Sequence, residues 1–436
     1  MNYIQKWRFA LIAFCLPLVL WAQKFEVSDD YLDEIYPSLE ELYIHFHQNP
    51  ELSMQEEETS TLMTQNLRDL GFEIITDLGA TNRAGIFRNG EGPVVLIRAD
   101  MDALPVREQT GLPYASEARG VNAEGDSTAI MHACGHDVHM TVFTGVARTL
   151  VRYKDEWSGT LVMVAQAAEE AGLGADLLFK NKLYDKVPKP DYALALHTSS
   201  YHEAGKVGYK SGPVLASVDM IDITVHGQGG HGAAPHTTID PIVLSAQLIE
   251  SFQTIVSREN NPFDPAVVTV GSIHGGKVHN VIPDEVKLQL TIRSYSTEVR
   301  NKIISALERK CNSLAKAAGL KEEQYPDIKI RDPYTPTTIN DKALTERLVG
   351  VFKNVLGEEN VVETPAYTFG EDFSRFGLQD HKVPICLFWL GAVDPEKMDG
   401  RDLPSLHSPF FAPLPEPTLK TGVKAMTSAA LELFEE

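Results

Sequence analysis

Apolar residues recur every three to four positions in the first part of the chain, which is the spacing of one face of an α-helix. This spacing predicts helices over residues 31–46 and 56–70, the second ended by Gly71. A later helix over residues 138–153 would be capped by Asp137. Short apolar runs predict strands over residues 72–76, 94–99, 161–165 and 192–196. Strands alternating with helices predict a three-layer α/β domain with a mostly parallel central sheet.

A different order of elements begins near residue 213. The pattern predicts strand, helix, strand, strand, helix and strand over residues 219–225, 240–258, 266–273, 285–293, 297–318 and 327–331. This βαββαβ order is that of the ferredoxin-like sandwich. A predicted helix over residues 342–356 and a buried strand through Trp389 then resume the strand–helix alternation of the first part of the chain. We therefore predict a small domain, residues 214–331, inserted into a larger one that comprises residues 23–213 and 332–436.

The first 22 residues are predicted to be a secretory signal peptide. Lys6 and Arg8 precede an apolar run, residues 9–20, that is too short to cross a bilayer about 30 Å thick. We expect cleavage after Ala22 and a periplasmic or secreted mature protein without a stable membrane anchor. A lipid anchor on Cys15 is less favoured because bulky Phe14 precedes it, and a retained membrane anchor stays open as an alternative.

The net charge of the chain bears on its partners, and the number of cysteines bears on its disulfides. Thirty-nine Lys and Arg against 60 Asp and Glu give a net charge of −21, which opposes binding to a phosphate backbone and argues against nucleic acid as a partner. After signal cleavage Cys134, Cys311 and Cys386 remain, an odd number. We interpret Cys311 and Cys386 as core residues, with a disulfide between them left open.

Metal-ligating residue types are densest in residues 131–139, Met-His-Ala-Cys-Gly-His-Asp-Val-His, directly before a predicted helix. Thiolate and imidazole together suit zinc or another late transition metal, and Gly135 lets the backbone bend so that Cys134 and His136 converge. Further ligands must come from elsewhere. The candidates that follow apolar strands or lie in loops are Glu169, Glu170, His197 and His407. Their joint placement fits two metal ions at the carboxyl ends of strands.

Each of these residues also has an ordinary interpretation. An acidic pair after a strand is often a solvated turn, a lone His is often a surface or core residue, and Cys134 alone would pass for a buried thiol. Asp100 and Asp102 end the strand over residues 94–99. They are explained equally well as a charged strand exit or as groups that orient ligand imidazoles.

The predicted small domain carries further polar candidates. Residues 227–232, Gly-Gln-Gly-Gly-His-Gly, match a dinucleotide-binding pattern, but Pro235 delays the next helix. We therefore interpret the glycines as freeing a loop that presents His231. Asn280 and Arg293 add an amide and a guanidinium that can hold a carboxylate.

Six segments together resemble the di-metal amidohydrolases, the family of hippurate hydrolase, the plant auxin-conjugate hydrolases and N-acetyldiaminopimelate deacetylase. They are Arg98-Ala-Asp-Met-Asp-Ala-Leu-Pro105, Met131-His-Ala-Cys-Gly-His-Asp-Val-His139, Glu169-Glu170, Gly229-Gly-His-Gly-Ala-Ala-Pro-His236, Asn280-Val-Ile-Pro-Asp284 and Phe369-Gly-Glu-Asp-Phe373. The resemblance extends from about Tyr31 to the C-terminus.

The resemblance implies a phosphorylase/hydrolase-like catalytic domain with an inserted lid through which the chain forms a homodimer. It also implies two divalent metal ions, zinc or manganese. Their ligands would be Cys134, His136, Glu170, His197 and His407. Distant carboxypeptidase and aminopeptidase relatives carry His-x-Asp where this chain has Asp100-Met-Asp102, so Asp100 is not expected to be a ligand, although both Asp residues belong to the predicted site.

The resemblance further implies a role for each remaining candidate. Glu169 would be the general base that takes a proton from a metal-bridging water. His231, reaching in from the partner subunit, and Asn280 would stabilise the oxyanion. Arg293 would bind the free carboxylate of the substrate.

The predicted function is metal-dependent hydrolysis of the amide bond of N-acyl amino acids or short peptide-like conjugates. Two alternatives stay open: a secreted dipeptidase or carboxypeptidase of the same fold, and a catalytically inactive metal-binding module. Phe388, Trp389 and Phe410 are candidates for an acyl pocket, with core packing as their ordinary interpretation.

Overall fold

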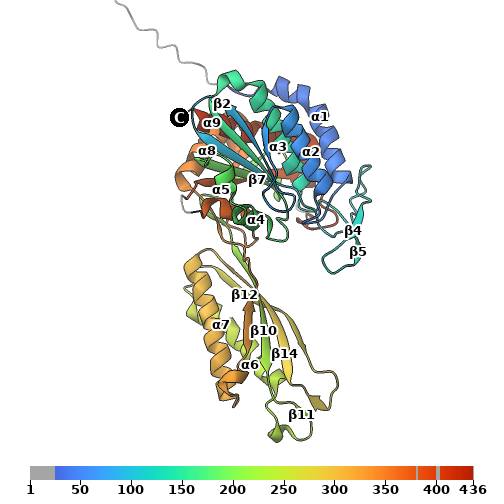
Figure 1. The fold of residues 1–436 in the computed structure, drawn as a ribbon, viewed down its shortest axis with the longest axis vertical. Coiled ribbons are helices and arrows are strands. Elements are labelled where there is room, and N and C mark those ends of the chain that lie inside the picture. The colour runs from blue at the N-terminus through green and yellow to red at the C-terminus, as the bar shows by residue number, and fades with distance from the viewer. Residues whose placement is uncertain (1–24, 380–381, 399–402, 436) are drawn as a thin grey trace, which may run out of the picture.

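A computed structural model describes residues 25–379, 382–398 and 403–435, arranged as a large α/β body joined to a smaller elongated one (Figure 1). The predicted signal peptide lies outside the described residues. Within them, every helix is either too short or too polar to cross a membrane.

The large body is built on an eight-stranded sheet. Its strands lie in the order β1, β2, β6, β3, β7, β18, β8, β17. Their bounds are β1 Glu73–Ile75, β2 Arg83–Asn89, β3 Val94–Asp100, β6 Gly159–Gln166, β7 Tyr192–Glu203, β8 Val207–Tyr209, β17 Val361–Glu363 and β18 Ile385–Val393.

The sheet is parallel at its centre and has antiparallel pairs on both sides of that centre, whereas its last pair, β8 and β17, is parallel again. Strands β6, β3, β7 and β18 pair in parallel, whereas β1, β2 and β6 pair antiparallel, as do β18 and β8. Residues 204–206 are too few for a crossover from β7, so β8 has to reverse direction. The predicted mostly parallel sheet is thus a mixed sheet with a parallel centre.

Helices cover both faces of this sheet, which confirms the predicted three-layer arrangement. One core joins Val95 and Ile97 of β3 to α1 Asp29–Gln48, α2 Glu57–Asp69, α3 His136–Arg152, α8 Lys342–Leu356 and α9 Pro415–Phe434. The other joins Leu96 to α4 Gly174–Lys180 and α5 Leu183–Lys186. Alternate residues of one strand therefore face opposite layers. Neither α9 nor β2 was predicted from the sequence.

Helix α3 begins two residues earlier than predicted. The position before its first turn is Gly135, whose φ of 81° is left-handed, and Asp137 lies inside that turn. The Asp137 carboxylate accepts from the backbone N–H of Val138 and lies 2.7 Å from Nδ1 of His47. The predicted capping role of Asp137 is therefore wrong, because glycine can start the helix where another residue would be strained.

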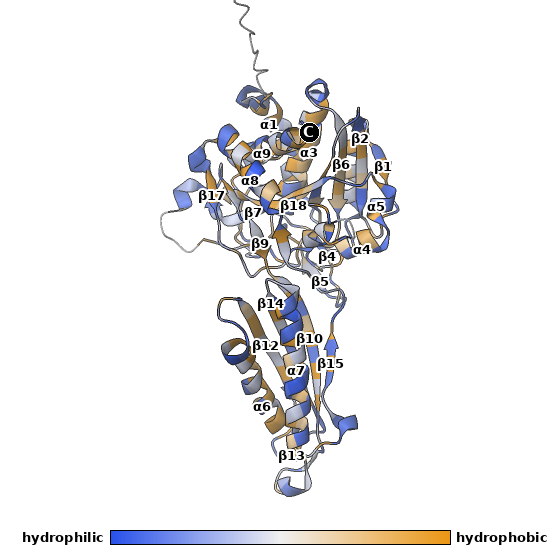
Figure 2. Cartoon of the chain, turned by 90° about the vertical axis from the view of Figure 1, so that its left-hand side faces the viewer, coloured by the Kyte–Doolittle hydropathy of each residue, from blue (hydrophilic) through white to orange (hydrophobic). Residues whose placement is uncertain are grey.

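The smaller body has the predicted βαββαβ order. Its antiparallel sheet has the order β12 Ala266–Gly275, β14 Glu285–Ser294, β10 Ser217–His226 and β15 Asp327–Ile330. Two helices, α6 Pro241–Thr254 and α7 Thr297–Ala317, pack on it around a core of its own. In Figure 2 many hydrophilic residues of α7 are visible, as expected for a helix with one face in the core. This confirms the ferredoxin-like expectation.

Two strands lie side by side where the chain enters and leaves the smaller body. Strand β9 Gly212–Leu215 pairs antiparallel with β16 Thr338–Asn340, and Val218 exchanges two backbone hydrogen bonds with Thr335. The predicted boundaries at residues 214 and 331 stay predictions, and both fall near this junction. The remaining strands pair as β4 Arg119–Val121 with β5 Ser127–Ala129 and β11 Gly230–His231 with β13 Val281–Ile282.

The cysteines of the two cores are buried thiols. Cys311 belongs to the core of the smaller body and Cys386 to that of the large one, and neither forms a disulfide. Their interpretation as core residues is confirmed.

Candidate metal centre and active site

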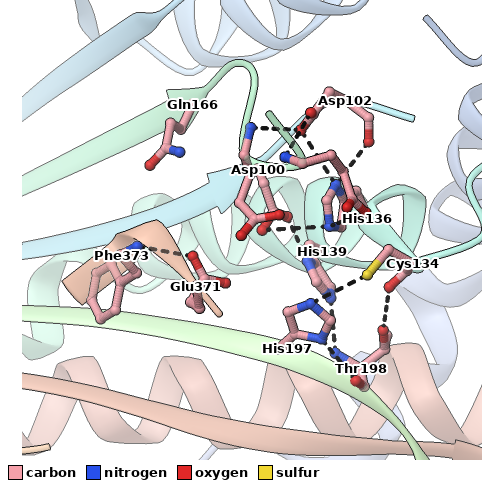
Figure 3. A network of polar contacts seen from close by, with 12 residues as sticks. Asp100, Asp102, Cys134, His136, His139, Gln166, His197, Thr198, Glu371 and Phe373 are labelled. Carbon is pink, nitrogen blue, oxygen red and sulfur yellow. Dashed lines mark hydrogen bonds and ion pairs between the residues drawn. The ribbon is translucent and has the colours of Figure 1, made fainter. Parts of the chain in front are cut away.

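The five predicted metal ligands lie together at the carboxyl end of the parallel strands. Sγ of Cys134 is 3.6 Å from Nε2 of His197 and 3.2 Å from Nε2 of His407. Two groups have ligand atoms within 4.8 Å of one another: Cys134, His136 and His197, and Cys134, Glu170 and His407. Figure 3 shows the first group. Because Cys134 belongs to both groups, it lies between two positions where a cation fits.

Two buried polar atoms of this cluster lack a hydrogen bond to any described residue, although Oε1 of Glu170 lies 3.3 Å from Nε2 of His407. Nε2 of His136 and Oε1 of Glu170 are buried and form no hydrogen bond within the part of the chain that the structure describes. They lie 3.9 Å apart. Buried polar atoms are seldom left unpaired because the free-energy cost is high. A divalent cation would satisfy both, so the residues present fit a metal.

Two of the three predicted ligand imidazoles are held in the orientation that metal binding needs. Nδ1 of His136 lies 2.7 Å from the backbone oxygen of Asp102, and Nδ1 of His197 lies 2.8 Å from that of Thr198. A carbonyl oxygen only accepts hydrogen bonds, so each Nδ1 carries the proton. The lone pair of each Nε2 is therefore free to bind a cation.

His139 is near the cluster, but both of its ring nitrogens already have hydrogen-bond partners. Its Nδ1 lies 2.5 Å from Oδ1 of Asp100, and its Nε2 accepts from the backbone N–H of Thr198. Since both ring nitrogens are used, His139 acts as a support that joins β3 to β7.

Gly135 and Thr198 shape the loop that carries Cys134. A Cβ atom on Gly135 would lie 2.5 Å from Oγ1 of Thr198, and that hydroxyl donates to the backbone oxygen of Cys134. The loop of His407 is tied to the same place, because its backbone N–H donates to the Ala133 oxygen at 2.8 Å. The glycine predicted from sequence to bend this loop is thus required by both its φ and its neighbour.

Asp100 and Asp102 support the cluster in different ways. The Asp102 carboxylate accepts the backbone N–H groups of Glu169 and Glu170, each at 3.0 Å, and so fixes the loop that carries both acids. Asp100 lies between His139 and the guanidinium of Arg98, which is 2.6 Å away. The geometry favours a positioning role over an ordinary strand exit for both residues.

A buried ionic network lies next to the cluster and contacts it through Asp100. This network was not predicted from the sequence. Arg98 donates to Asp100, to Glu371 at 2.9 Å and to Asp372 at 3.0 Å. In the sequence, Glu371 and Asp372 stand out only as part of the segment Phe369-Gly-Glu-Asp-Phe373. The available signal was Arg98 itself, because a charged residue inside an apolar strand requires buried partners.

The electrostatics of the cluster favour cations. Burial, and the neighbouring carboxylates of Glu371 and Glu170, raise the pKa of Glu169 well above its usual range. Burial and the nearby Glu170 and Glu169 likewise raise the pKa of the Cys134 thiol. Both pKa shifts come first from burial and then from the neighbouring negative charge, and a bound divalent cation would oppose them.

A cavity of about 970 Å³ opens from the cluster toward the smaller body. Its lining includes Glu169, whose carboxylate forms no hydrogen bond or ion pair with any described residue, and Arg293 of β14. Arg293 is partly buried, and burial lowers the pKa of its guanidinium. It has no ion-pair partner among the described residues, so its charge is available to a ligand in the cavity.

The structure does not bring His231 and Asn280 to this site within one chain. Both are exposed, at the paired strands β11 and β13 at the far end of the smaller body (Figure 1). The ten residues of β10 carry the chain about 30 Å away from the junction before it reaches His231. Their predicted oxyanion role is therefore not possible in cis and requires a second subunit.

The three aromatic candidates for an acyl pocket separate in the structure. Phe388 is buried in the core, Trp389 lines the cavity, and Phe410 is exposed without lining it. Only Trp389 keeps its candidate role.

Known proteins resemble the chain over most of its length. The family profile described as Peptidase family M20/M25/M40 matches residues 96–432. Thermostable carboxypeptidase 1 of Saccharolobus solfataricus is 37% identical over 88% of this chain and 93% of its own. N-acetyl-L-cysteine deacetylase of Bacillus subtilis is 38% identical over 76% of each chain.

A solved structure has the same fold. It is a Bacillus subtilis protein described as a dinuclear metal binding peptidase from the M20 family. It superimposes with a TM-score of 0.75 at 28% identity and covers 92% of this chain and 99% of its own.

His47 of α1 contacts the first turn of α3 through Asp137. Its ring nitrogens lie 2.7 Å from Asp137 and 3.1 Å from Glu108, so the imidazole is doubly protonated between two acceptors. Burial lowers the pKa of His47, but the hydrogen bonds to Asp137 and Glu108 outweigh it and raise the pKa to about 9. Charged His47 therefore stabilises the fold that positions His136.

We predict that this stabilisation depends on pH. It is fully present below the unfolded pKa of about 6.5 and is lost as pH rises through the folded pKa of about 9. His47→Gln should lower the free energy of unfolding by about 3 kcal/mol more at pH 6 than at pH 10, measured by urea denaturation. His45→Gln, an exposed His on the same helix, is the control. If the difference in free energy of unfolding between the wild type and His47→Gln is the same at both pH values, His47 is not the charged group assigned here.

Proposed function

The chain belongs to peptidase family M20/M25/M40, and from this membership we propose that it is a metal-dependent amidohydrolase acting on N-acyl amino acids or short peptide-like conjugates. One observation carries the proposal: five potential ligands converge while the neighbouring Glu169 carboxylate stays unpaired and faces the same cavity. A catalytically inactive metal-binding module would have no need for that free carboxylate.

The residues of the cluster would hold two divalent cations. Cys134, His136 and His197 form one group and Cys134, Glu170 and His407 the other. A mixture of thiolate, imidazole and carboxylate suits zinc or manganese. When bound, the cations would activate a water molecule and polarise the amide carbonyl.

Glu169 supplies the proton transfers. Its carboxylate lies close to His136 and Glu170, within 4.8 Å, and also close to Glu371 and Asp372. It takes the proton released from water and hands it to the departing amine. Asp102 keeps the carboxylate in place through the backbone of Glu169. A group in this role has to move a proton without being fixed by other partners.

Arg293 selects substrates that carry a free carboxylate. Its guanidinium lines the same cavity as Glu169, on the opposite body of the molecule, and is partly desolvated. Two parallel N–H donors match a carboxylate better than any neutral group. The α-carboxylate of an N-acyl amino acid fits this position.

A second candidate is a carboxypeptidase. It is supported by the relative at 37% identity that is named as one, and Arg293 would serve it equally well. Substrates with a free α-amino group would need an acidic partner in the cavity, so a panel of N-acylated and free-amine substrates separates the two activities.

We propose that the chain acts as a homodimer through the smaller body. Strand β12 is an edge of its sheet, and several exposed apolar side chains lie nearby. They are Ile242, Val243, Ile273, Val278 and Val281. An edge strand beside an apolar surface is suited to self-association. Such a dimer would allow His231 and Asn280 to reach the partner's cavity.

We also propose a periplasmic or secreted location and no stable membrane anchor. The support is the predicted signal peptide, residues 1–22, which lies outside the described residues.

Glu169→Gln should lower kcat for N-acyl amino acids about 100- to 10,000-fold, because the proton acceptor is lost while the ligands remain. Elemental analysis should show an unchanged metal content. Glu170→Gln is the matched comparison, one residue along the same loop, and should lose metal as well as activity. Glu169→Gln enzyme with the activity of the wild type would refute the mechanism.

Mixing two inactive variants tests the dimer. Glu169→Gln and His231→Ala should each be inactive alone, and after subunit exchange roughly a quarter of the sites would combine an intact Glu169 with an intact His231 from the partner. The measurement is hydrolysis after mixing, with sedimentation to establish the dimer. If heterodimers are confirmed in the mixture and hydrolytic activity does not recover, a role for His231 in trans is contradicted.

A further inference from the structure

The short segment that carries Glu169 is bound to the rest of the large body through its backbone. Four consecutive N–H groups, those of residues 167–170, each donate to a side chain from another part of the chain. The acceptors are Asn82 for Ala167 and Glu56 for Ala168, both at 2.8 Å, and Asp102 for Glu169 and Glu170, both at 3.0 Å. The conformation of this segment is therefore set by tertiary contacts.

Ala168, the residue directly before Glu169, has a left-handed backbone. Its φ is 51°, a conformation that costs an L-residue free energy because its Cβ crowds the following carbonyl oxygen. Both backbone polar groups of Ala168 are bound, the N–H by Glu56 and the carbonyl oxygen by the N–H groups of Leu173 and Gly174. Strained residues of this kind persist where the surrounding structure fixes them, often at active sites. Because β6 ends at Gln166, the φ of Ala168 sets the direction in which Glu169 leaves the strand.

Glu56 stands immediately before α2 and is fully buried. A polar side chain at this position often caps its own helix, but the Glu56 carboxylate makes no such bond. Its Oε1 accepts from the N–H groups of Ala168 and, at 3.0 Å, of Met54, and its Oε2 accepts from the Thr81 hydroxyl at 2.6 Å. A buried carboxylate is costly unless it is bonded, and this one uses its acceptors on the segment of Glu169 instead of on α2.

We propose that Glu56 is a positioning residue for the proton transfer: by binding Ala168 in its left-handed conformation, it directs the Glu169 carboxylate into the cavity. The proposal rests on the proposed function, in which Glu169 moves the proton. The Glu169 carboxylate forms no hydrogen bond or ion pair with any described residue, so its direction depends on the backbone that carries it. Glu56 does not line the cavity and acts through Ala168 alone.

Two substitutions of Glu56 test the proposal in the metal-loaded mature enzyme. Glu56→Ala should lower kcat for N-acyl amino acids about 10- to 100-fold, because a misplaced proton acceptor works poorly. KM and metal content should stay near those of the wild type, since Arg293 and the predicted ligands are unchanged. Glu56→Gln should keep most of kcat, because its amide oxygen can accept from Ala168 and its NH2 group can donate to Thr81.

Glu51→Ala is the matched control. The Glu51 carboxylate accepts from the N–H groups of Glu58 and Thr59 in the first turn of α2, at 3.2 and 2.8 Å, and has no bond to Ala168. Loss of either acid should lower the free energy of unfolding in urea, but only Glu56→Ala should lower kcat. Equal losses of kcat in Glu51→Ala and Glu56→Ala would overturn the proposal, because the effect would then come from a weakened α2.

Glycine at position 168 shows whether Glu56 acts through the backbone. Glycine adopts a left-handed φ without the Cβ cost, so Ala168→Gly in the Glu56→Ala background should raise kcat about fivefold or more. A crystal structure of Glu56→Ala adds a readout independent of activity, in which Ala168 should have left the left-handed region.

Three results would overturn the positioning role: an unchanged φ and kcat in Glu56→Ala, no recovery with glycine, or Glu56→Gln as impaired as Glu56→Ala. A changed φ in Glu56→Ala, together with a wild type that hydrolyses no amide, would instead overturn the proposed function.

Discussion

The structure around the cavity depends on how buried negative charge is compensated. Six carboxylates converge at one edge of the large sheet, from Asp100, Asp102, Glu169, Glu170, Glu371 and Asp372. Arg98 pairs with three of them, and the backbone N–H groups of the Glu169 loop pair with Asp102. The Glu169 carboxylate has no hydrogen bond or ion pair with any described residue, and Glu170 and the Cys134 thiol lie against imidazoles of the cluster rather than a permanent cation. Isolated buried charge is costly, so the arrangement is understandable as a site completed by cations.

The fold produces this convergence through its parallel strands. β3 and β6 end side by side, and His197 lies in the neighbouring β7 near the same level, so residues that are remote in sequence meet there. Backbone carbonyls then fix the imidazoles of His136 and His197 by accepting from Nδ1. The smaller body adds Arg293 from across the cavity. The strands and the loops that follow them therefore fix where the candidate ligand side chains lie.

Much of this could be predicted from sequence because it depends on local patterns. Periodicity indicated the three-layer domain and the βαββαβ order, and the residue types of Cys134, His136 and Glu170 indicated a metal. Features that depend on tertiary contact could not be found in that way. The local pattern predicts Asp137 as a helix cap, because its actual partner, His47, is 90 residues away in the sequence. Tyr201, Phe369 and Trp389 line one cavity but come from distant segments, so nothing local in the sequence showed that they lie together.

The central claim is that two cations occupy the cluster while Glu169 remains uncoordinated. Anomalous diffraction from crystals of the mature protein, grown with zinc or manganese, tests it most directly. The account predicts two peaks per chain, both bound by atoms of Cys134, His136, Glu170, His197 and His407, with Glu169 outside the coordination shells. Absence of both peaks from this cluster, or Glu169 bound as a ligand in place of Glu170, would contradict it.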